Sequence, residues 1–307
     1  MPIPTLLPLL AAFLWAVVGH LDKYIIDKIA DNREVGALTL FSALAGVPVV
    51  ATLWLIFGAQ LWDHAPRTLL VMTAAGFLYV LGVIPYLYAM SYGETSSVMP
   101  QMLMVPLFTL VLGYALLDEV LTRAQLAGGA LIMAGALGLT LHMADSQERF
   151  AWRALGMVLL TSLCFALNSL LFKYAVVEEL PYWTAIFWEH VGFVVFSVVV
   201  IAGVGRYRRQ FIALIRQNGA PAIGLNALGE AIMLAGNFAF HYAALLAPVA
   251  LVNFLAEGTQ PFFVLLLGVL LSVFAPHIAQ EDIRPHALTR KVVAVSVMVG
   301  GLLLIGI

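Results

Sequence analysis

Polar side chains recur at helical spacing within two strongly apolar segments of the second half of the chain. Segment 221–246 carries four of them, Asn226, Glu230, Asn237 and His241. Their spacings of four, seven and four residues place them on one face of an α-helix. Segment 248–274 carries Asn253, Glu257 and Gln260, again on one face. Two polar stripes, each with a carboxyl group deep in an apolar segment, predict the lining of an internal cavity.

The two glutamates are the residues of these stripes best suited to chemistry. A carboxyl group is costly to bury in a bilayer without a partner, so Glu230 and Glu257 are predicted to bind a substrate or exchange a proton. We expect Asn237, His241 and Asn253 to bind the substrate beside them. The alternative for the amide side chains is interhelical hydrogen bonding, worth about 0.6 kcal/mol per bond. The sequence leaves both interpretations open for the amides.

Three other ionisable residues lie inside apolar segments. Glu189 and His190 point about 100° apart on segment 182–205, so one can line the cavity while the other packs. Glu189 is a third candidate for proton coupling, and His190 is interpreted as a packing residue. His20, in segment 6–26, is interpreted as structural, with proton handling as the alternative.

Aromatic side chains supply the rest of a candidate binding site. Trp15 lies near the middle of segment 6–26, and Tyr79 and Tyr86 share a face of segment 68–90. Gly82 between the two tyrosines opens space beside them. These aromatics are too deep for an interfacial belt, and we expect them to contact a cationic group by cation–π interaction or stacking.

Two lysines near segment ends, Lys23 and Lys173, have a simpler interpretation. We expect them to extend to the membrane interface or to pair with acids nearby in sequence, Asp22 and Asp27 for Lys23 or Glu178 for Lys173.

Several classes of function find no support in the sequence. There is no zincin, serine-hydrolase, P-loop or paired-cysteine motif, so no enzyme activity, cofactor or metal is predicted. The histidines cannot be shown to converge on a metal. A net charge of -2 gives no footprint for nucleic acid.

Composition requires that the segments carrying these residues span a membrane. Hydrophobic residues make up 63% of the 307, and only 10% are charged, against about 25% in soluble domains. A spanning helix needs about 20 apolar residues. Ten segments qualify: 6–26, 35–57, 68–90, 96–117, 124–143, 154–177, 182–205, 221–246, 248–274 and 288–307. The sequence predicts an all-α protein with ten transmembrane helices, in the plasma (inner) membrane.

The ten segments form two related halves, 1–147 and 148–307. Residues 13–24 align without a gap with 163–174, at an offset of 150. Gly82 aligns with Gly236 at an offset of 154, and Pro106 aligns with Pro261 at an offset of 155. Because each half has an odd number of helices, the second enters the membrane from the opposite side. Inverted repeats of this kind are common in secondary transporters. The halves differ in their polar chemistry: Glu230 aligns with Gly76, His241 with Leu87, Asn253 with Met99 and Glu257 with Leu103.

The chain resembles the ten-helix EamA-type members of the drug/metabolite transporter superfamily. The resemblance rests on the five-plus-five plan, on the Trp15 helix ending at Lys23 and Tyr24, on Ala89, Ser97 and Pro106, and on the hairpin at 117–119 with the glycine-rich helix after it. The second half departs from this pattern, because a longer insertion at 272–291 stands where a short acidic hairpin is expected.

Loop charges and the resemblance disagree about orientation. On the amino-terminal side, the loops hold three Lys and Arg residues, and those on the other side hold twelve. The positive-inside rule then places both termini outside, whereas the resemblance implies termini in the cytoplasm. Both orientations stay open.

The leading hypothesis is an alternating-access secondary transporter with a small-molecule substrate. The cavity is expected between segments 6–26, 68–90, 96–117, 154–177, 221–246 and 248–274. Three deep acids favour a cationic or zwitterionic metabolite such as an amino acid or amine. The alternatives are a membrane-embedded scaffold, which requires a packed interior, and a lipid-modifying enzyme, which requires a reactive cluster near one interface. Glycines of segments 124–143 and 288–307 are expected at the periphery or at a homodimer contact; a monomer is the alternative.

Overall fold

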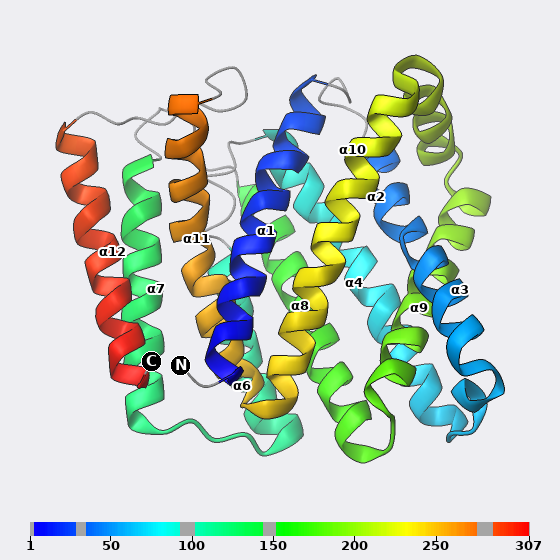
Figure 1. Cartoon of the computed structure of the whole chain (residues 1–307), viewed down its shortest axis with the longest axis horizontal. Coiled ribbons are helices and arrows are strands. Elements are labelled where there is room, and N and C mark those ends of the chain that lie inside the picture. The colour runs from blue at the N-terminus through cyan, green and yellow to red at the C-terminus, as the bar shows by residue number, and fades with distance from the viewer. Residues whose placement is uncertain (1–2, 29–34, 93–101, 144–151, 275–284, 307) are drawn as a thin grey trace.

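The computed structural model describes residues 3–28, 35–92, 102–143, 152–274 and 285–306. In these residues the chain is helical and contains no strand (Figure 1). The α-helices are α1 (Ile3–Lys28), α2 (Val35–Leu44), α3 (Gly46–Phe57), α4 (Pro66–Tyr92), α6 (Met104–Leu117), α7 (Arg123–Met143), α8 (Trp152–Glu178), α9 (Tyr182–Gly203), α10 (Gly205–Leu246), α11 (Val249–Phe274) and α12 (Pro285–Ile305), with a 3₁₀ helix η1 at Gly58–Trp62.

The number of helices differs from the ten predicted. Eleven α-helices are present in the described residues, because segment 35–57 is divided into α2 and α3 at Ala45. Pro48 has no N–H to donate to the carbonyl of Leu44, which interrupts the helix there. Part of segment 96–117 lies outside the described residues. The described residues are all-helical, as predicted. The predicted number of ten transmembrane helices is not confirmed.

In the part of the chain that the structure describes, seven helical stretches are long and apolar enough to cross a membrane. They are Thr5–Ile26, Val35–Trp62, Pro66–Met90, Gly156–Glu178, Tyr182–Gly203, Gly219–Leu246 and Val249–Phe274. Met104–Leu117 and Lys291–Ile305 are apolar but shorter. Large apolar side chains also cover the outside of the molecule: Leu55 is 84% exposed and Phe274 is 81% exposed. A surface of this kind is suited to lipid rather than water.

Helix α10 contains a sharp change of direction. Gly219 has φ 50° and ψ -137°, outside the helical region, and Pro221 follows it. The connection that precedes the predicted segment 221–246 is therefore itself helical, from Gly205 onward. A glycine is needed at 219 because positive φ is unfavourable for other residues.

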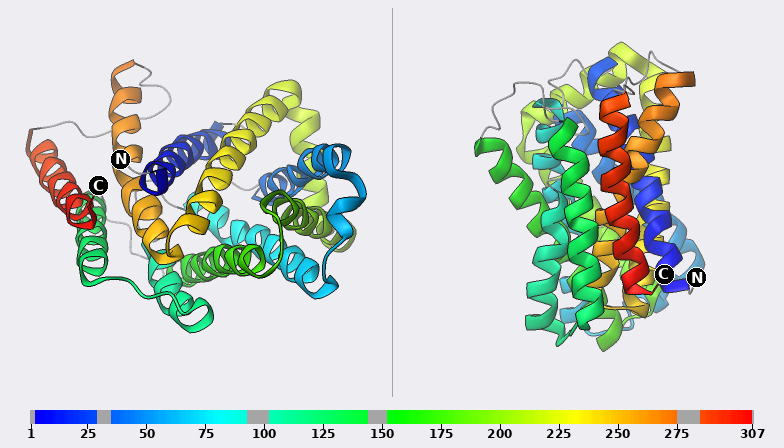
Figure 2. Two further views of the ribbon diagram at one scale, coloured as in Figure 1. Left: turned by 60° about the horizontal axis from the view of Figure 1, so that its bottom comes forward. Right: turned by 90° about the vertical axis from the view of Figure 1, so that its left-hand side faces the viewer.

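Glycines let several helices approach closely. Helices α7 and α12 pack together at one end of the molecule, where α7 also contacts α11 (Figure 2). A Cβ at Gly128 would lie 2.7 Å from the carbonyl oxygen of Gly301, and one at Gly301 would lie 2.6 Å from that of Gly128. These glycines therefore serve a contact within the chain. Whether helices α7 and α12 also take part in a homodimer contact remains a prediction.

Candidate functional site

A cavity of about 100 Å³ lies between the helices. That volume holds roughly six to ten waters. Its walls come from α1, α2, α4, the residues around the start of α6, α8, α10 and α11. All eight residues predicted to bind substrate line it: Trp15, Tyr79, Tyr86, Glu230, Asn237, His241, Asn253 and Glu257. Their placement is as the sequence indicated, and their role in binding remains a prediction.

A chain of hydrogen bonds crosses the cavity from α1 to α4. The indole Nε1 of Trp15 donates to Oδ1 of Asn237 at 3.0 Å, and Nδ2 of Asn237 donates to the hydroxyl of Tyr79 at 3.1 Å. Tyr79 is itself stacked between Phe165 and Phe193, with ring centroids 5.0 and 5.2 Å away. Asn237 on α10 therefore links the two halves of the chain, and the stacking fixes the direction of the Tyr79 ring.

An acidic region lies where α1, α2 and α10 meet. The hydroxyl of Ser42 donates to Oε1 of Glu230 at 2.5 Å. Asp22 also lines the cavity, where it interacts electrostatically with Glu230 and through its side chain with Tyr86. Two carboxyl groups in one poorly solvated region repel each other unless a proton or a cation lies between them. This arrangement suits the binding of positive charge.

The third acid of the cavity is on α11. Glu257 and Gln260 both line the cavity and are buried. Neither side chain has a hydrogen-bond or ion-pair partner among the described residues. Asn253 differs, because its Nδ2 donates to the carbonyl of Val249 on its own helix at 3.1 Å. Of the three polar residues in this stripe, two are open to a ligand.

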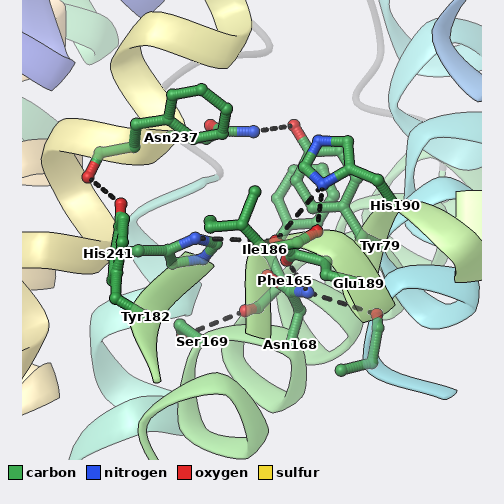
Figure 3. Close-up of polar contacts among 12 residues, drawn as sticks. Tyr79, Phe165, Asn168, Ser169, Tyr182, Ile186, Glu189, His190, Asn237 and His241 are labelled. Atoms are coloured by element: carbon green, nitrogen blue, oxygen red, sulfur yellow. Dashed lines mark hydrogen bonds and ion pairs between the residues drawn. The ribbon is translucent and has the colours of Figure 1, made fainter. Parts of the chain in front are cut away.

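Glu189 is not among the residues that line the cavity. Figure 3 shows its polar contacts with neighbouring side chains. Its Oε1 accepts a hydrogen bond from Nδ2 of Asn168 at 2.7 Å. Its Oε2 is 3.7 Å from Nδ1 of His241. Asn168 and His241 both line the cavity, so Glu189 is one side chain away from it. Glu189 therefore does not itself line the cavity, and its role in proton coupling remains a prediction.

The remaining histidines and lysines have structural partners. Nδ1 of His190 lies 2.7 Å from the carbonyl of Ile186, and Nε2 of His20 lies 3.0 Å from the carbonyl of Val264. Nζ of Lys173 pairs with Glu119 at 2.6 Å. The predicted partner Glu178 is exposed at the end of α8, so that prediction is wrong.

The charge of the lining has one sign. Asp22, Glu230 and Glu257 contribute carboxyl groups, and no Lys or Arg is among the described lining residues. No group of three or more His, Cys, Asp or Glu in the described residues is placed to hold a metal ion. The site therefore offers acids, amides and aromatic rings.

Several lining residues were not predicted from the sequence, although helical spacing and the alignment of the two halves identify them. Asp22 follows Trp15 by seven residues, which puts both on one face of α1. Phe165 and Asn168 align with Trp15 and Val18 at the repeat offset of 150, and all four line the cavity. Helix α2, which contributes Leu38 and Ser42, had no comparable signal because Ser42 is a lone hydroxyl in an apolar run.

Apolar helices around a polar internal cavity define the protein as a multi-pass integral membrane protein. Residues 3–141 match the model of the EamA-like transporter family. The matched stretch lies within the first predicted repeat, 1–147. This stretch of the chain is therefore similar to the EamA-like transporter family, the family that the sequence resembles.

Two similar proteins extend this comparison. A "Probable amino-acid metabolite efflux pump" of Salmonella typhimurium is 34% identical over 140 residues. That alignment covers 42% of this chain and 46% of the Salmonella protein, so it spans about half of either. A protein of known crystal structure aligns over 99% of this chain and 96% of its own, with a TM-score of 0.61 and 17% identity. The latter similarity shows a shared fold.

Proposed function

We propose that the protein is a secondary active transporter that moves a small organic metabolite by alternating access, in the plasma (inner) membrane. The observation that carries this proposal is the cavity, which collects side chains from both halves of the chain. Cationic or zwitterionic substrates such as an amino acid or an amine suit its acids and aromatic rings. The name of the Salmonella relative, an amino-acid metabolite efflux pump, is in line with that substrate class.

The packing of the helices supports an inverted repeat, the architecture on which alternating access depends. In the repeat, α1 is equivalent to α8 and α4 is equivalent to α10. The contact between α1 and α10 therefore has an equivalent between α8 and α4, and both contacts are present. A Cβ at Gly82 would lie 2.8 Å from Cβ of Cys164, and one at Gly236 would lie 2.8 Å from Nε1 of Trp15. Equivalent glycines thus pack against equivalent points near the middle of α8 and α1. Two halves related in this way can rock about a fixed central site.

Proton coupling is proposed through Glu230, Glu257 or Glu189. The first two line the cavity, and Glu189 reaches it through His241. Such a carboxyl group must lose its proton before it binds a cationic substrate. The proton and the substrate therefore occupy it alternately.

Transport into proteoliposomes with and without a pH gradient tests this. Wild-type protein should accumulate substrate only with a gradient, and Glu230→Gln or Glu257→Gln should abolish that dependence. Glu178→Gln, at the exposed end of α8, is the control and should behave as wild type. Full gradient-driven uptake by Glu230→Gln, Glu257→Gln and Glu189→Gln alike contradicts proton coupling.

A membrane-embedded scaffold is the second candidate, and the cavity is the observation against it. A scaffold has no use for two unpartnered polar side chains in its interior, which Glu257 and Gln260 represent. A lipid-modifying enzyme requires reactive groups near an interface, whereas Tyr79, Glu230 and Glu257 lie well inside their helices. Transport is therefore the function that the geometry supports best.

A further inference from the structure

The polar side chains of the cavity fall into two groups. In the first group the side chains are hydrogen-bonded to each other. Asn237 bonds to both Trp15 and Tyr79, and Ser42 donates to Glu230. On α11, by contrast, the Glu257 and Gln260 side chains are only 7% and 5% exposed and have no partner among the described residues. Buried polar groups are nearly always hydrogen-bonded, so unpartnered ones that face a cavity indicate a ligand.

The backbone at this point of α11 offers an additional acceptor. Pro261 follows Gln260 inside the helix and has no N–H. The carbonyl of Glu257, four residues earlier, therefore lacks its usual helical donor. The two oxygens of the Glu257 carboxylate and the side-chain oxygen of Gln260 make three acceptors on cavity-lining side chains within one turn. A primary ammonium group has three N–H donors and matches this set.

Part of the cavity wall that comes from the first half of the chain is apolar, beside the polar Asp22, Ser42, Tyr79 and Tyr86. At the offset of 155 that aligns Pro106 with Pro261, Glu257 corresponds to Met102 and Gln260 to Val105, and both of these line the cavity. Corrected in this way, the partner of Glu257 in the repeat is Met102 rather than Leu103. The first half adds further apolar lining residues: Val18, Leu38, Val83 and Leu87. A ligand with its charge on α11 therefore has an apolar wall for the rest of its body.

The sign of the charge separates an amine from an amino acid. Three carboxyl groups line the cavity, and the described lining has no Lys or Arg to balance a ligand carboxylate. A carboxylate brought into this site faces like charges in a poorly solvated space, which costs affinity.

We propose that the cavity binds a primary amine with an apolar body, with the ammonium group held by Glu257 and Gln260 and the body packed on the wall from the first half. This rests on the proposed function, in that the cavity is taken as the substrate site. It narrows the substrate class from cationic or zwitterionic metabolites to monocationic apolar amines.

Calorimetric titration of the purified protein with three ligands tests the proposal: 2-phenylethylamine, phenylalanine, and N,N,N-trimethyl-2-phenylethylammonium. We expect 2-phenylethylamine to bind most tightly, since phenylalanine adds a carboxylate and the trimethyl compound has no N–H donor. Glu257→Gln should weaken binding of the amine by about tenfold to a hundredfold, the usual effect of a charged hydrogen bond. Gln260→Leu keeps the charge and should weaken it by a smaller factor. Glu178→Gln, matched in chemistry but outside the cavity, should leave it unchanged.

Two results overturn the proposal: unchanged affinity in both cavity variants, provided that they melt like wild type, or phenylalanine binding as tightly as the amine. If Glu257→Gln fails to fold, Gln260→Leu alone decides, and unchanged amine affinity in it counts against the proposal. Tight, Glu257-dependent binding without uptake into proteoliposomes contradicts the proposed transport and leaves the amine site standing. Uptake of another metabolite with no amine binding contradicts the amine site alone.

Discussion

Glu119 joins three helices near the end of the molecule where α6, α8 and α11 meet, and its removal gives a measurable test of the fold. Its Oε1 lies 2.6 Å from Nζ of Lys173 on α8, and its Oε2 accepts a hydrogen bond from the backbone N–H of Val249, at the start of α11, at 2.7 Å. Lys173 also donates to the carbonyl of Ala247 at 2.8 Å. The side chains of Lys173 and Glu119 are 14% and 10% exposed, so water compensates little for a lost partner.

Glu119→Gln removes the charge and keeps the shape. Breaking a buried ion pair from one side costs about 3–5 kcal/mol, because the remaining charge is left uncompensated. The amide oxygen of the glutamine can still accept from Val249, so the expected loss in the free energy of unfolding is about 3 kcal/mol. Lys173→Met should cost less, since the helix N-terminus at Val249 remains a favourable partner for the Glu119 carboxylate.

Denaturation of the purified variants in mixed micelles, followed by circular dichroism, measures these free energies. The double variant should be more stable than the sum of the single losses predicts, by about 1–3 kcal/mol, since the two residues are in contact. Glu178→Gln changes the exposed acid that the sequence suggested for Lys173, and should change stability by less than about 0.5 kcal/mol. Additive losses from Glu119→Gln and Lys173→Met, or a large loss from Glu178→Gln, refute the assigned pairing.

Two further predictions follow from single contacts. Gly76→Ala should lower the melting temperature sharply, because its Cβ would overlap the backbone carbonyl oxygen of Glu189, whereas Gly156→Ala has open space and should not; equal melting of the two variants contradicts this close approach. Glu179, outside the spanning helices, accepts hydrogen bonds from the backbone N–H of Ala65 and then from the hydroxyl of Thr68, which lower the pKa of its carboxyl group. The stabilising effect of the ionised Glu179 carboxyl group is complete above its ordinary pKa of about 4.3. It is lost as the pH falls through the lowered pKa of the folded protein. The difference in melting temperature between wild type and Glu179→Gln should therefore persist at neutral pH and vanish in strong acid.

Much of the fold and site follows from sequence pattern, and what is missing depends on tertiary contacts. Helical spacing identified Glu230 and Glu257 because period and burial are local properties of one helix. The partner of Lys173 was misassigned because Glu119 is far away in sequence and meets it only when α6 and α8 pack. The same holds for Ser42, whose hydroxyl gains meaning only from the Glu230 carboxylate on another helix.

The position of Glu230 in the second half follows from the spacing of the helices. Ser42 aligns with Gly192 at an offset of 150, and Glu230 aligns with Gly76 at 154, so the contacts Ser42–Glu230 and Gly192–Gly76 are repeat equivalents. At the second contact a Cβ on Gly192 would lie 3.0 Å from Cα of Gly76, which means that the backbones of α4 and α9 nearly touch. No acid fits at 76, whereas the equivalent contact between α2 and α10 leaves room for a hydroxyl and a carboxylate. The duplicated scaffold therefore carries the Glu230 carboxyl group at the helix pair that stands farther apart, α2 with α10, and a glycine at the equivalent pair, α4 with α9.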